Sequence, residues 1–257
     1  MLAIINQRAP GPEPRAPARE GDSIIRVLRT LTLREVLPAT PRARIVRLDL
    51  DAEPFDYLPG QAVVIGSVGA DARKPYSIAS APEDARRDGF IELLVGVNGD
   101  GVAGPHLALE PGTLVDVDGP LGAFTFPDAP QETCFVFIAG GTGIAPLRAM
   151  LRRALHLPHR NVGLFYSART PEEFAFEPEL RALADTGEIE LRQTVTRAAR
   201  TEWTGARGRI DRAALSALVH QPETLCFICG PAAMVDEMPR VLRELGIARE
   251  KIRIEEW

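Results

Sequence analysis

The pattern of hydrophobic and polar positions changes its period near the middle of the chain. Before about residue 130, short hydrophobic runs are separated by turns such as Pro59-Gly60 and Pro111-Gly112. Runs of about four to eight residues bounded by turn residues are typical of β-strands. They predict a small antiparallel six-stranded barrel with one brief helix around Val102–Leu109. The predicted strands are Leu31–Val36, Ala43–Leu50, Gln61–Val68, Lys74–Ser80, Phe90–Val97 and Leu114–Asp118.

From about residue 131, hydrophobic strands alternate with amphipathic helical segments. Cys134–Ala139 has no polar side chain beyond its thiol, which is typical of a parallel strand covered on both faces. The alternation predicts a five-stranded, doubly wound parallel sheet. Pro239 lies in the last helical segment, where it predicts a kink or the true first turn. The other strands expected are Val162–Tyr166, Ile189–Val195, Leu225–Cys229 and Ile252–Glu255, and the helices are Pro146–Leu157, Glu177–Asp185, Arg212–Val219 and Met234–Leu245.

The two patterns divide the chain into three parts. Residues 1–22 contain four prolines and lack hydrophobic periodicity, so they predict a flexible tail. Residues 23–130 form the predicted barrel, and residues 131–257 form the predicted α/β domain. A barrel followed by a doubly wound sheet is the expected fold class.

Composition and charge narrow the function classes. The chain has 30 basic and 35 acidic residues among 257, which argues against a general nucleic-acid binder. Its hydrophobic runs are shorter than the ~18 residues that cross a membrane. The start, MLAIINQRAP, is too short in hydrophobic residues for a signal peptide, so a cytoplasmic protein without membrane contact is expected.

The three cysteines do not predict a metal site. Cys226 and Cys229 have the spacing of a metal-binding pair, but a zinc or iron–sulfur site needs about four ligands and only Cys134 remains. The surrounding segment also has the pattern of a buried strand, in which positions three apart face opposite sides. Reduced, buried thiols are therefore expected.

A glycine-rich loop, Gly140-Gly-Thr-Gly-Ile-Ala-Pro146, joins a predicted strand to a predicted helix. Glycines let the backbone approach a phosphate, and the N–H groups at a helix start attract negative charge. Pro146 suits the first helical turn, where an N–H group is not needed. The loop predicts nucleotide binding, with a plain strand–helix turn as the alternative. It lacks the Gly-Lys-Ser/Thr of a phosphate-transfer loop, which argues against an ATPase.

Five motifs in one order carry a family resemblance. Lys74-Pro-Tyr-Ser77 is similar to an Arg-x-Tyr-Ser flavin motif, and Gly119–Phe124 is similar to a Gly-Pro-x-Gly-x-Phe turn. They are followed by Gly140–Pro146, by Cys229-Gly-Pro231 with Met234, and by Glu255-Glu-Trp257. In these motifs the sequence resembles the ferredoxin–NADP(+) reductase superfamily. The resemblance implies FAD at the barrel and a nicotinamide nucleotide at the parallel sheet.

The resemblance assigns the flavin site to two segments of the barrel. It implies that the Tyr76 ring lies against the isoalloxazine and that the Ser77 hydroxyl bonds flavin N5. The family arginine is replaced by Lys74, which cannot form a bidentate fork, so either Arg73 reaches the phosphate or flavin binding is weaker. The expected flavin-binding residues are Arg73, Lys74, Pro75, Tyr76, Ser77, Gly101, Val102, Ala103 and Gly104.

The second flavin segment departs from the family pattern. Gly104 stands where the family has a serine or threonine, although backbone N–H groups can still hold a phosphate. FAD is therefore expected, with FMN as the less favoured cofactor. His106 follows two residues later and is expected on the surface of the brief helix.

The resemblance places four residues at the hydride-transfer centre: Ser77, Cys229, Glu255 and Trp257. Cys229 is alternatively a small buried residue, Glu255 a solvated carboxylate, and Trp257 a side chain packed between the domains. The expected nicotinamide-binding residues are Gly141, Thr142, Gly143, Pro146, Cys229, Gly230, Pro231 and Met234.

Arginines favour NADP(H) over NAD(H). Arg169 and Arg197 match positions at which NADP-dependent relatives hold the 2′-phosphate, and Arg207 and Arg209 follow. The second parallel strand does not end on an acidic residue, which an NAD site would use to bind the free 2′-hydroxyl. Plain surface arginines are the alternative.

The expected function is hydride transfer between NAD(P)H and bound FAD, followed by electron transfer to a separate ferredoxin, flavodoxin or oxygenase component. Three cysteines are too few for an iron–sulfur cluster, so a separate acceptor is expected. One alternative is a free-flavin reductase, which Lys74 and Gly104 favour. Another is a non-catalytic electron-relay subunit, against which the intact nucleotide motifs argue. The sequence leaves the oligomeric state open.

Overall fold

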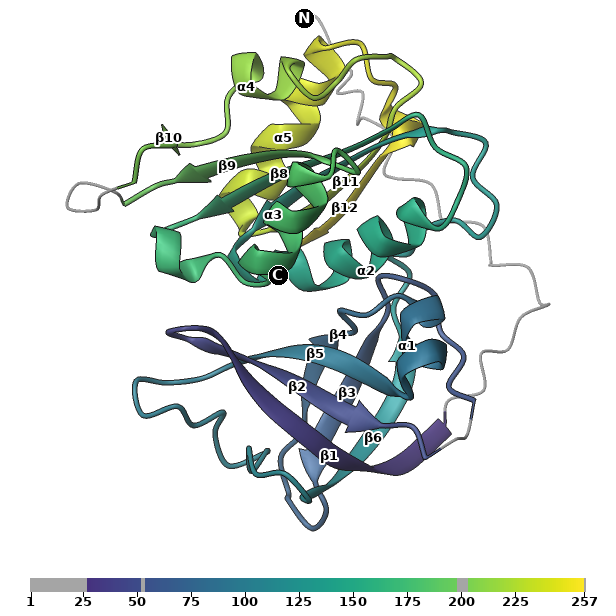
Figure 1. Ribbon diagram of the computed structural model, residues 1–257, viewed down its shortest axis with the longest axis vertical. Helices are drawn as coiled ribbons and strands as arrows, with labels where there is room; N and C mark the ends of the chain where they lie inside the picture. Colours follow the sequence, from purple (N-terminus) through teal and green to yellow (C-terminus); the bar gives the residue numbers. More distant parts are fainter. Residues whose placement is uncertain (1–26, 52–53, 198–202, 257) are drawn as a thin grey trace, which may run out of the picture.

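The computed structural model describes residues 27–51, 54–197 and 203–256. Two six-stranded sheets lie one above the other, the first antiparallel and the second parallel (Figure 1). The predicted tail, residues 1–22, and Trp257 lie outside the described residues. The domain bounds at residues 23, 130 and 131 stay predictions.

The first sheet is the barrel. Its strand order is β4-β3-β6-β1-β2-β5, and the neighbouring strands pair antiparallel. A bridge between Ile78 and Leu93 joins the end of β4 to β5 and so closes the sheet on itself. Alternate side chains, such as Leu33, Val63 and Val117, fill the interior. The strands are β1 Val27–Thr40, β2 Ala43–Asp49, β3 Ala62–Ser67, β4 Lys74–Ser77, β5 Phe90–Gly96 and β6 Leu114–Leu121.

The described part of the barrel contains one helix, and its predicted place was wrong. Helix α1 covers Pro82–Asp88, whereas Val102–Leu109 has no helix. Gly101 and Gly104 have positive φ angles of 78° and 116°, which an α-helix does not allow. Helix α1 carries ordinary signals, with a proline in its first turn and a left-handed glycine, Gly89, at its end.

The second sheet is parallel throughout, in the order β10-β9-β8-β7-β11-β12. It has six strands where five were predicted, because β10 consists of two exposed residues without a hydrophobic pattern. The strands are β7 Cys134–Gly140, β8 Asn161–Ala168, β9 Glu190–Val195, β10 Ala206–Arg207, β11 Leu225–Gly230 and β12 Ile252–Glu256.

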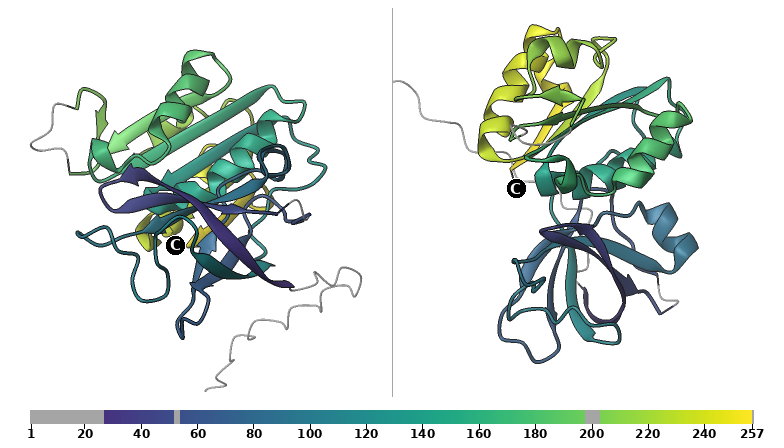
Figure 2. Two further views of the ribbon diagram at one scale, coloured as in Figure 1. Left: turned by 60° about the horizontal axis from the view of Figure 1, so that its bottom comes forward. Right: turned by 60° about the vertical axis from the view of Figure 1, so that its left-hand side comes forward.

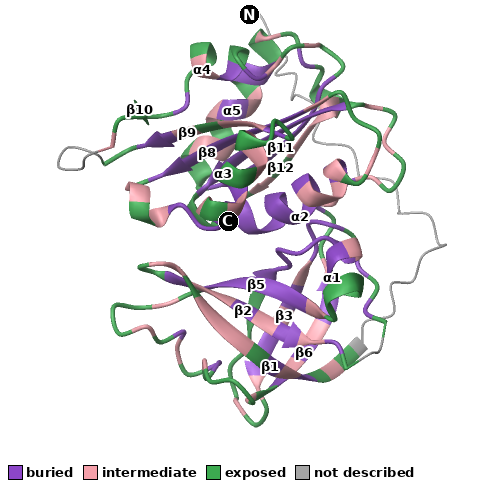
Figure 3. Cartoon of the chain, viewed as in Figure 1, coloured by how far each residue is buried: buried purple, intermediate pink, exposed green. Residues whose placement is uncertain are grey.

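Helices cover both faces of the parallel sheet, and its central strands are buried throughout (Figure 3). Leu147 and Leu180 pack on one face, while Leu215 and Leu242 pack on the other. Helix α5 runs through Pro239, so this proline does not mark its first turn. The helices are α2 Ile144–Leu155, α3 Glu177–Asp185, α4 Arg212–Ser216 and α5 Ala232–Glu244, with 3₁₀ turns η1 Gly141–Gly143, η2 Pro171–Glu173 and η3 Arg249–Lys251.

The cysteines follow the predicted strand pattern. Cys226 and Cys229 are buried on opposite faces of the parallel sheet, since each packs in a different core cluster. This confirms the predicted buried strand, in which positions three apart face opposite sides. Helices long and apolar enough to cross a membrane are absent from the described residues.

Aromatic rings join the barrel to the parallel sheet. Phe126, which follows β6, stacks on Phe227 of β11 with ring centroids 5.4 Å apart and lies 5.1 Å from Phe135 of β7. Two further views show the barrel and the parallel-sheet half from other sides (Figure 2). The shared core holds the cleft between the halves in a defined shape.

Candidate active site

Two loops at the carboxyl ends of β7 and β11 lie in direct contact. A Cβ atom at Gly143 would lie 2.3 Å from the carbonyl oxygen of Cys229, and one at Gly140 would lie 2.7 Å from Cδ of Pro231. These are contacts that only glycine allows. The sequence motifs Gly140–Pro146 and Cys229–Pro231 therefore form one surface, at the strand ends where open α/β sheets bind their ligands.

This surface forms one wall of a cleft of about 820 Å³, and barrel residues form the other wall. Clefts of this size accommodate cofactors. Eight predicted binding residues line it: Val102, Ala103, Gly104, Gly141, Thr142, Arg169, Pro231 and Met234. Other residues that line the cleft were not predicted as binding residues, because they belong to none of the sequence motifs. They include Arg42, Asn98, Glu173 and Glu237.

Ser77 ends strand β4 and is the strongest single sign of a ligand at the barrel. Its side chain is buried, yet its Oγ has no hydrogen-bond partner among the described residues. A buried hydroxyl without a partner costs free energy, and such groups often serve a bound molecule. Ser77 fits the predicted role of hydrogen-bonding a flavin.

His106 is buried, so its predicted surface position was wrong. Its Nε2 lies 2.8 Å from the Tyr76 hydroxyl, and the two rings are stacked with centroids 5.9 Å apart. Burial and the nearby Lys74 charge lower the pKa of His106, which favours a neutral imidazole. His106 therefore fixes the Tyr76 ring from one side. This burial could not be predicted, because a lone histidine after Gly104-Pro105 fits a surface turn equally well.

The structure separates the two basic residues of the flavin motif. The Arg73 guanidinium donates to Asp116 at 2.7 Å, which holds it on β6. The Lys74 ammonium instead lies 4.0 Å from the point that a Cβ atom on Gly104 would occupy. Lys74 is thus one cation beside the second predicted flavin segment, and Arg44, with Nη2 3.3 Å from the Cβ position of Gly101, is another, while Arg73 is engaged elsewhere.

Cys229 and Glu255 face each other on neighbouring strands, as partners in the register of β11 and β12. Burial, together with the Glu255 charge, raises the pKa of the Cys229 thiol. The thiol therefore stays protonated and is a poor nucleophile. Burial also raises the pKa of Glu255 to about 7. Glu255 is thus a carboxyl group that exchanges its proton near neutral pH, and not a fully solvated carboxylate.

The arginines predicted for NADP(H) are only partly at the cleft. Arg169 lines it, whereas Arg197 lies outside the lining, although its N–H bonds the Arg169 carbonyl at 2.8 Å. Arg209 lines the cleft as well, from the loop that follows β10. Two arginines of the parallel-sheet half, Arg169 and Arg209, therefore line the cleft from separate segments.

Comparisons with known proteins agree with this geometry. Residues 30–126 match the oxidoreductase FAD-binding domain, and residues 137–239 match the oxidoreductase NAD-binding domain. Ferredoxin–NADP reductase B of Sorangium cellulosum is 32% identical over 236 residues, which cover 86% of this chain and 94% of that protein. The chain belongs to the ferredoxin–NADP reductase superfamily. It is an FAD- and NAD(P)-binding oxidoreductase.

Other members of the ferredoxin–NADP reductase superfamily resemble this one along most of the chain. The ferredoxin–NAD(+) reductase component of the Xanthobacter autotrophicus alkene monooxygenase system is 31% identical, over 96% of this chain and 76% of its own. Cytochrome b5 reductase 4 of Danio rerio is 30% identical, but the match covers only 38% of it. The cytochrome P450 reductase of Amycolatopsis has a TM-score of 0.76 at 28% identity, over 93% of this chain and 73% of its own.

The raised pKa of Glu255 predicts how the stability of this superfamily member depends on pH. An unfolded glutamate titrates near pH 4.5, so between about pH 4.5 and 7 the folded chain keeps a proton that the unfolded chain has lost. The contribution of Glu255 to folding therefore falls as the pH rises through this window. We expect Glu255→Gln to gain thermal stability relative to the parent protein between about pH 5 and pH 8.

The measurement is the melting temperature of both proteins across this range. Glu256→Gln is the matched control, because Glu256 is the exposed neighbour on the same strand. A difference between parent and Glu255→Gln that stays constant with pH would contradict the prediction.

Proposed function

We propose that this reductase transfers hydride between NAD(P)H and FAD bound at the barrel, and passes electrons to a separate ferredoxin, flavodoxin or oxygenase component. The cleft carries the proposal, because barrel segment 102–104 faces the glycine loop across it. FAD supplies the chemistry, since it accepts two electrons together and releases them singly. Relatives named as parts of ferredoxin and oxygenase systems support this class of acceptor.

Residues inside and outside the cleft lining have separate roles in this proposal. Gly141, Thr142, Pro231 and Met234 line the cleft, whereas Ser77, Lys74, Gly143, Cys229, Gly230 and Glu255 do not. The Ser77 hydroxyl donates to the flavin ring, and Lys74 neutralises flavin phosphate as a point charge. Backbone N–H groups of Gly141–Gly143 bind the nucleotide phosphates, and Gly230, Pro231 and Met234 shape the nicotinamide pocket. Pro146 lies in the first turn of α2 behind this loop. Cys229 supplies a small, protonated side chain, and Glu255 holds the exchangeable proton next to it. Since hydride transfer needs close approach, catalysis is mainly positioning.

NADP(H) is the favoured nucleotide. Arg169 and Arg209 line the cleft, and a 2′-phosphate is well matched by two guanidinium groups.

We expect Arg169→Ala to raise the KM for NADPH about tenfold while that for NADH changes little, because one charge-assisted hydrogen bond is lost. Steady-state assays with both nucleotides measure this. Arg212→Ala, on the exposed start of α4, is the control. Equal losses with both nucleotides would contradict the assignment.

One experiment tests the proposed function. The protein is purified, its visible spectrum recorded, and NADPH or NADH added without oxygen. Bound flavin that bleaches supports the reductase, and the faster nucleotide identifies the preferred donor. A colourless protein that does not retain added FAD supports a free-flavin reductase, which Lys74 and the missing hydroxyl at Gly104 favour. Bound flavin that neither nucleotide reduces supports an electron-relay subunit. A cytoplasmic location stays a prediction.

A further inference from the structure

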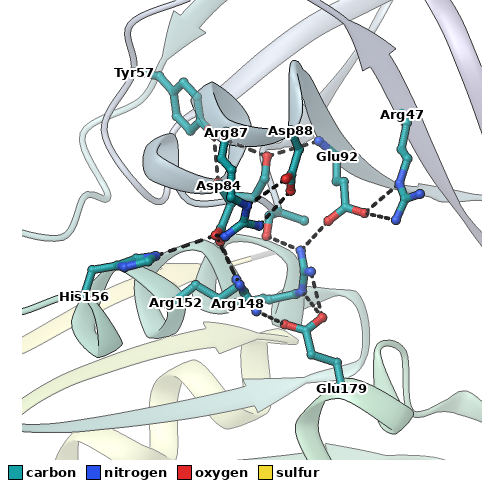
Figure 4. Close-up of polar contacts among 12 residues, drawn as sticks. Arg47, Tyr57, Asp84, Arg87, Asp88, Glu92, Arg148, Arg152, His156 and Glu179 are labelled. Atoms are coloured by element: carbon teal, nitrogen blue, oxygen red, sulfur yellow. Dashed lines mark hydrogen bonds and ion pairs between the residues drawn. The ribbon is translucent and has the colours of Figure 1, made fainter. Parts of the chain in front are cut away.

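A cluster of charged side chains fills the junction between helix α2 and the barrel (Figure 4). It shares none of its residues with the lining of the large cleft, so it lies outside the proposed reaction site. Arginines from α2 bind carboxylates from both halves of the molecule. The members of this junction cluster are Glu83, Asp84, Glu92, Arg148, Arg152, Arg153 and Glu179.

Arg148 is the most buried cation of the junction cluster, with 9% of its side chain exposed. One of its nitrogens donates to the Ala79 carbonyl and to Glu92, both at 2.7 Å. The others contact Glu179 at 2.7 and 2.8 Å, and the guanidinium lies 4.4 Å from the Phe176 ring centroid. A single planar group thus holds three segments of the chain at fixed distances, which a lysine could not do.

Arg148 and its partner Ala79 are close in sequence to the nucleotide loop and to the flavin strand, respectively. Ala79 is two residues after Ser77, and its N–H is fixed by the Glu92 carbonyl at 2.7 Å. Arg148 itself lies about one turn into α2, which begins immediately after the glycine loop at Gly143. The path from the nucleotide loop to the flavin strand therefore consists of one helical turn, one guanidinium group and the two residues Ile78 and Ala79 that follow β4.

Arg152 lies one turn further along the same face of α2. It binds Asp84 of α1 and Glu179, with one contact to Asp84 at 3.1 Å. It therefore joins the same two halves, but at α1 instead of the flavin strand. Arg148 and Arg152 form a matched pair with similar charge partners and different distances in sequence from the cleft.

Buried ion pairs add little to stability compared with well-packed apolar residues, so stability alone does not explain the junction cluster. Buried ion pairs of fixed geometry can, however, hold α2 and the barrel at a defined distance. We propose that Arg148 is a positioning residue for hydride transfer, which sets the distance between the flavin strand and the nucleotide loop from behind the cleft. The inference rests on the proposed function and extends it to a residue outside the cleft.

The first test compares Arg148→Met and Arg148→Lys with Arg152→Met, each as the flavin-loaded full chain. Rapid anaerobic mixing with NAD(P)H gives the nucleotide Kd, the limiting rate of flavin bleaching and the long-wavelength charge-transfer absorbance of stacked nicotinamide and flavin. A misplacement of about 1 Å costs about 100-fold in rate. We expect both Arg148 variants to lose about 100-fold in limiting rate and most of the charge-transfer absorbance, with little change in Kd.

Arg152→Met separates positioning from packing. It removes a similar number of ion pairs, so it should lower the melting temperature as Arg148→Met does while keeping the limiting rate and the charge-transfer absorbance close to those of the parent. If the Arg148 variants keep both properties, the proposal is wrong. If Arg152→Met loses both to the same extent, the junction cluster acts as general packing and the proposal is also wrong.

The second test does not depend on nucleotide reduction. Spin labels are placed on Leu114→Cys of the barrel and Arg243→Cys of helix α5, both exposed positions, while the three native cysteines are buried. Pulsed electron paramagnetic resonance then gives the distribution of distances between the halves. We expect a narrow distribution in the parent and in Arg152→Met, and a broader or shifted one in Arg148→Met. Unchanged distributions would overturn the proposal. If neither nucleotide bleaches the parent flavin, the proposed function fails, and this measurement still decides the role of Arg148.

Discussion

Gly143→Ala is expected to slow nucleotide-dependent reduction about 100-fold and to destabilise the fold. The new methyl group would lie 2.3 Å from the Cys229 carbonyl oxygen and 2.9 Å from the Gly230 nitrogen. Both are backbone atoms, so the two loops must separate. Overpacking of this kind costs about 1–3 kcal/mol in unfolding free energy. A displacement of about 1 Å at a reacting centre costs a further 100-fold in rate. The melting temperature and the rate of flavin bleaching by NADPH measure the two effects.

Gly99→Ala is the control for this substitution. A Cβ atom there meets nothing within 4 Å, so the same chemical change should leave both quantities near the parent values. A Gly143→Ala protein that melts and reacts like Gly99→Ala would show that the loops are not in the contact described.

Ser77→Ala and Ser80→Ala form a second contrast, between two buried serines three residues apart. Ser77 Oγ lacks a partner within the described part of the chain, whereas Ser80 Oγ accepts the Glu92 N–H at 3.1 Å and lies 3.2 Å from the Tyr57 hydroxyl. Removing an oriented hydrogen-bond donor at a reacting centre costs about 100-fold to 1,000-fold in rate. We expect that loss in flavin reduction for Ser77→Ala, without loss of stability in the flavin-free protein.

Ser80→Ala should behave in the opposite way. It leaves the Glu92 N–H without its acceptor, so the flavin-free protein should lose about 1–3 kcal/mol in unfolding free energy. Denaturant unfolding of the flavin-free proteins and rapid mixing of the loaded ones provide both readouts. A Ser77→Ala protein that reduces its flavin at the parent rate would remove Ser77 from the proposed mechanism.

Most of the fold could be predicted because burial on one or both faces leaves a clear hydrophobic period. The uniformly hydrophobic strand β7 and the alternating strands of the barrel are of this kind. Helix α1 was missed because its seven residues are mostly charged, and only Pro82 and Gly89 mark its ends. The helix expected around Val102–Leu109 was wrong, because Gly101 and Gly104 at positive φ determine the backbone there. Strand β10 has no hydrophobic residue larger than alanine to reveal it.

The site was predictable where it depends on backbone shape and not where it depends on long side chains. The glycine loop is one continuous stretch of sequence, and so is the Cys229–Pro231 segment. The two are in contact because they follow the neighbouring strands β7 and β11. The burial of His106, the engagement of Arg73 by Asp116 and the approach of Arg209 depend on pairs of residues far apart in the chain. A single sequence does not show which distant side chain an arginine will bind.

The contact between the two loops and the ion pairs of α2 place different demands on a chimera made with a relative. Gly140 and Gly143 fit against Pro231 and Cys229 of the other loop with no spare volume. Both loops belong to the parallel-sheet half, so a chimera that takes this half intact inherits a compatible pair. The arginines of α2, in contrast, reach across to Glu83, Asp84 and Glu92 of the barrel. A chimera that joins this α2 to a relative's barrel should therefore keep carboxylates at positions 83, 84 and 92, so that the arginines of α2 keep their partners.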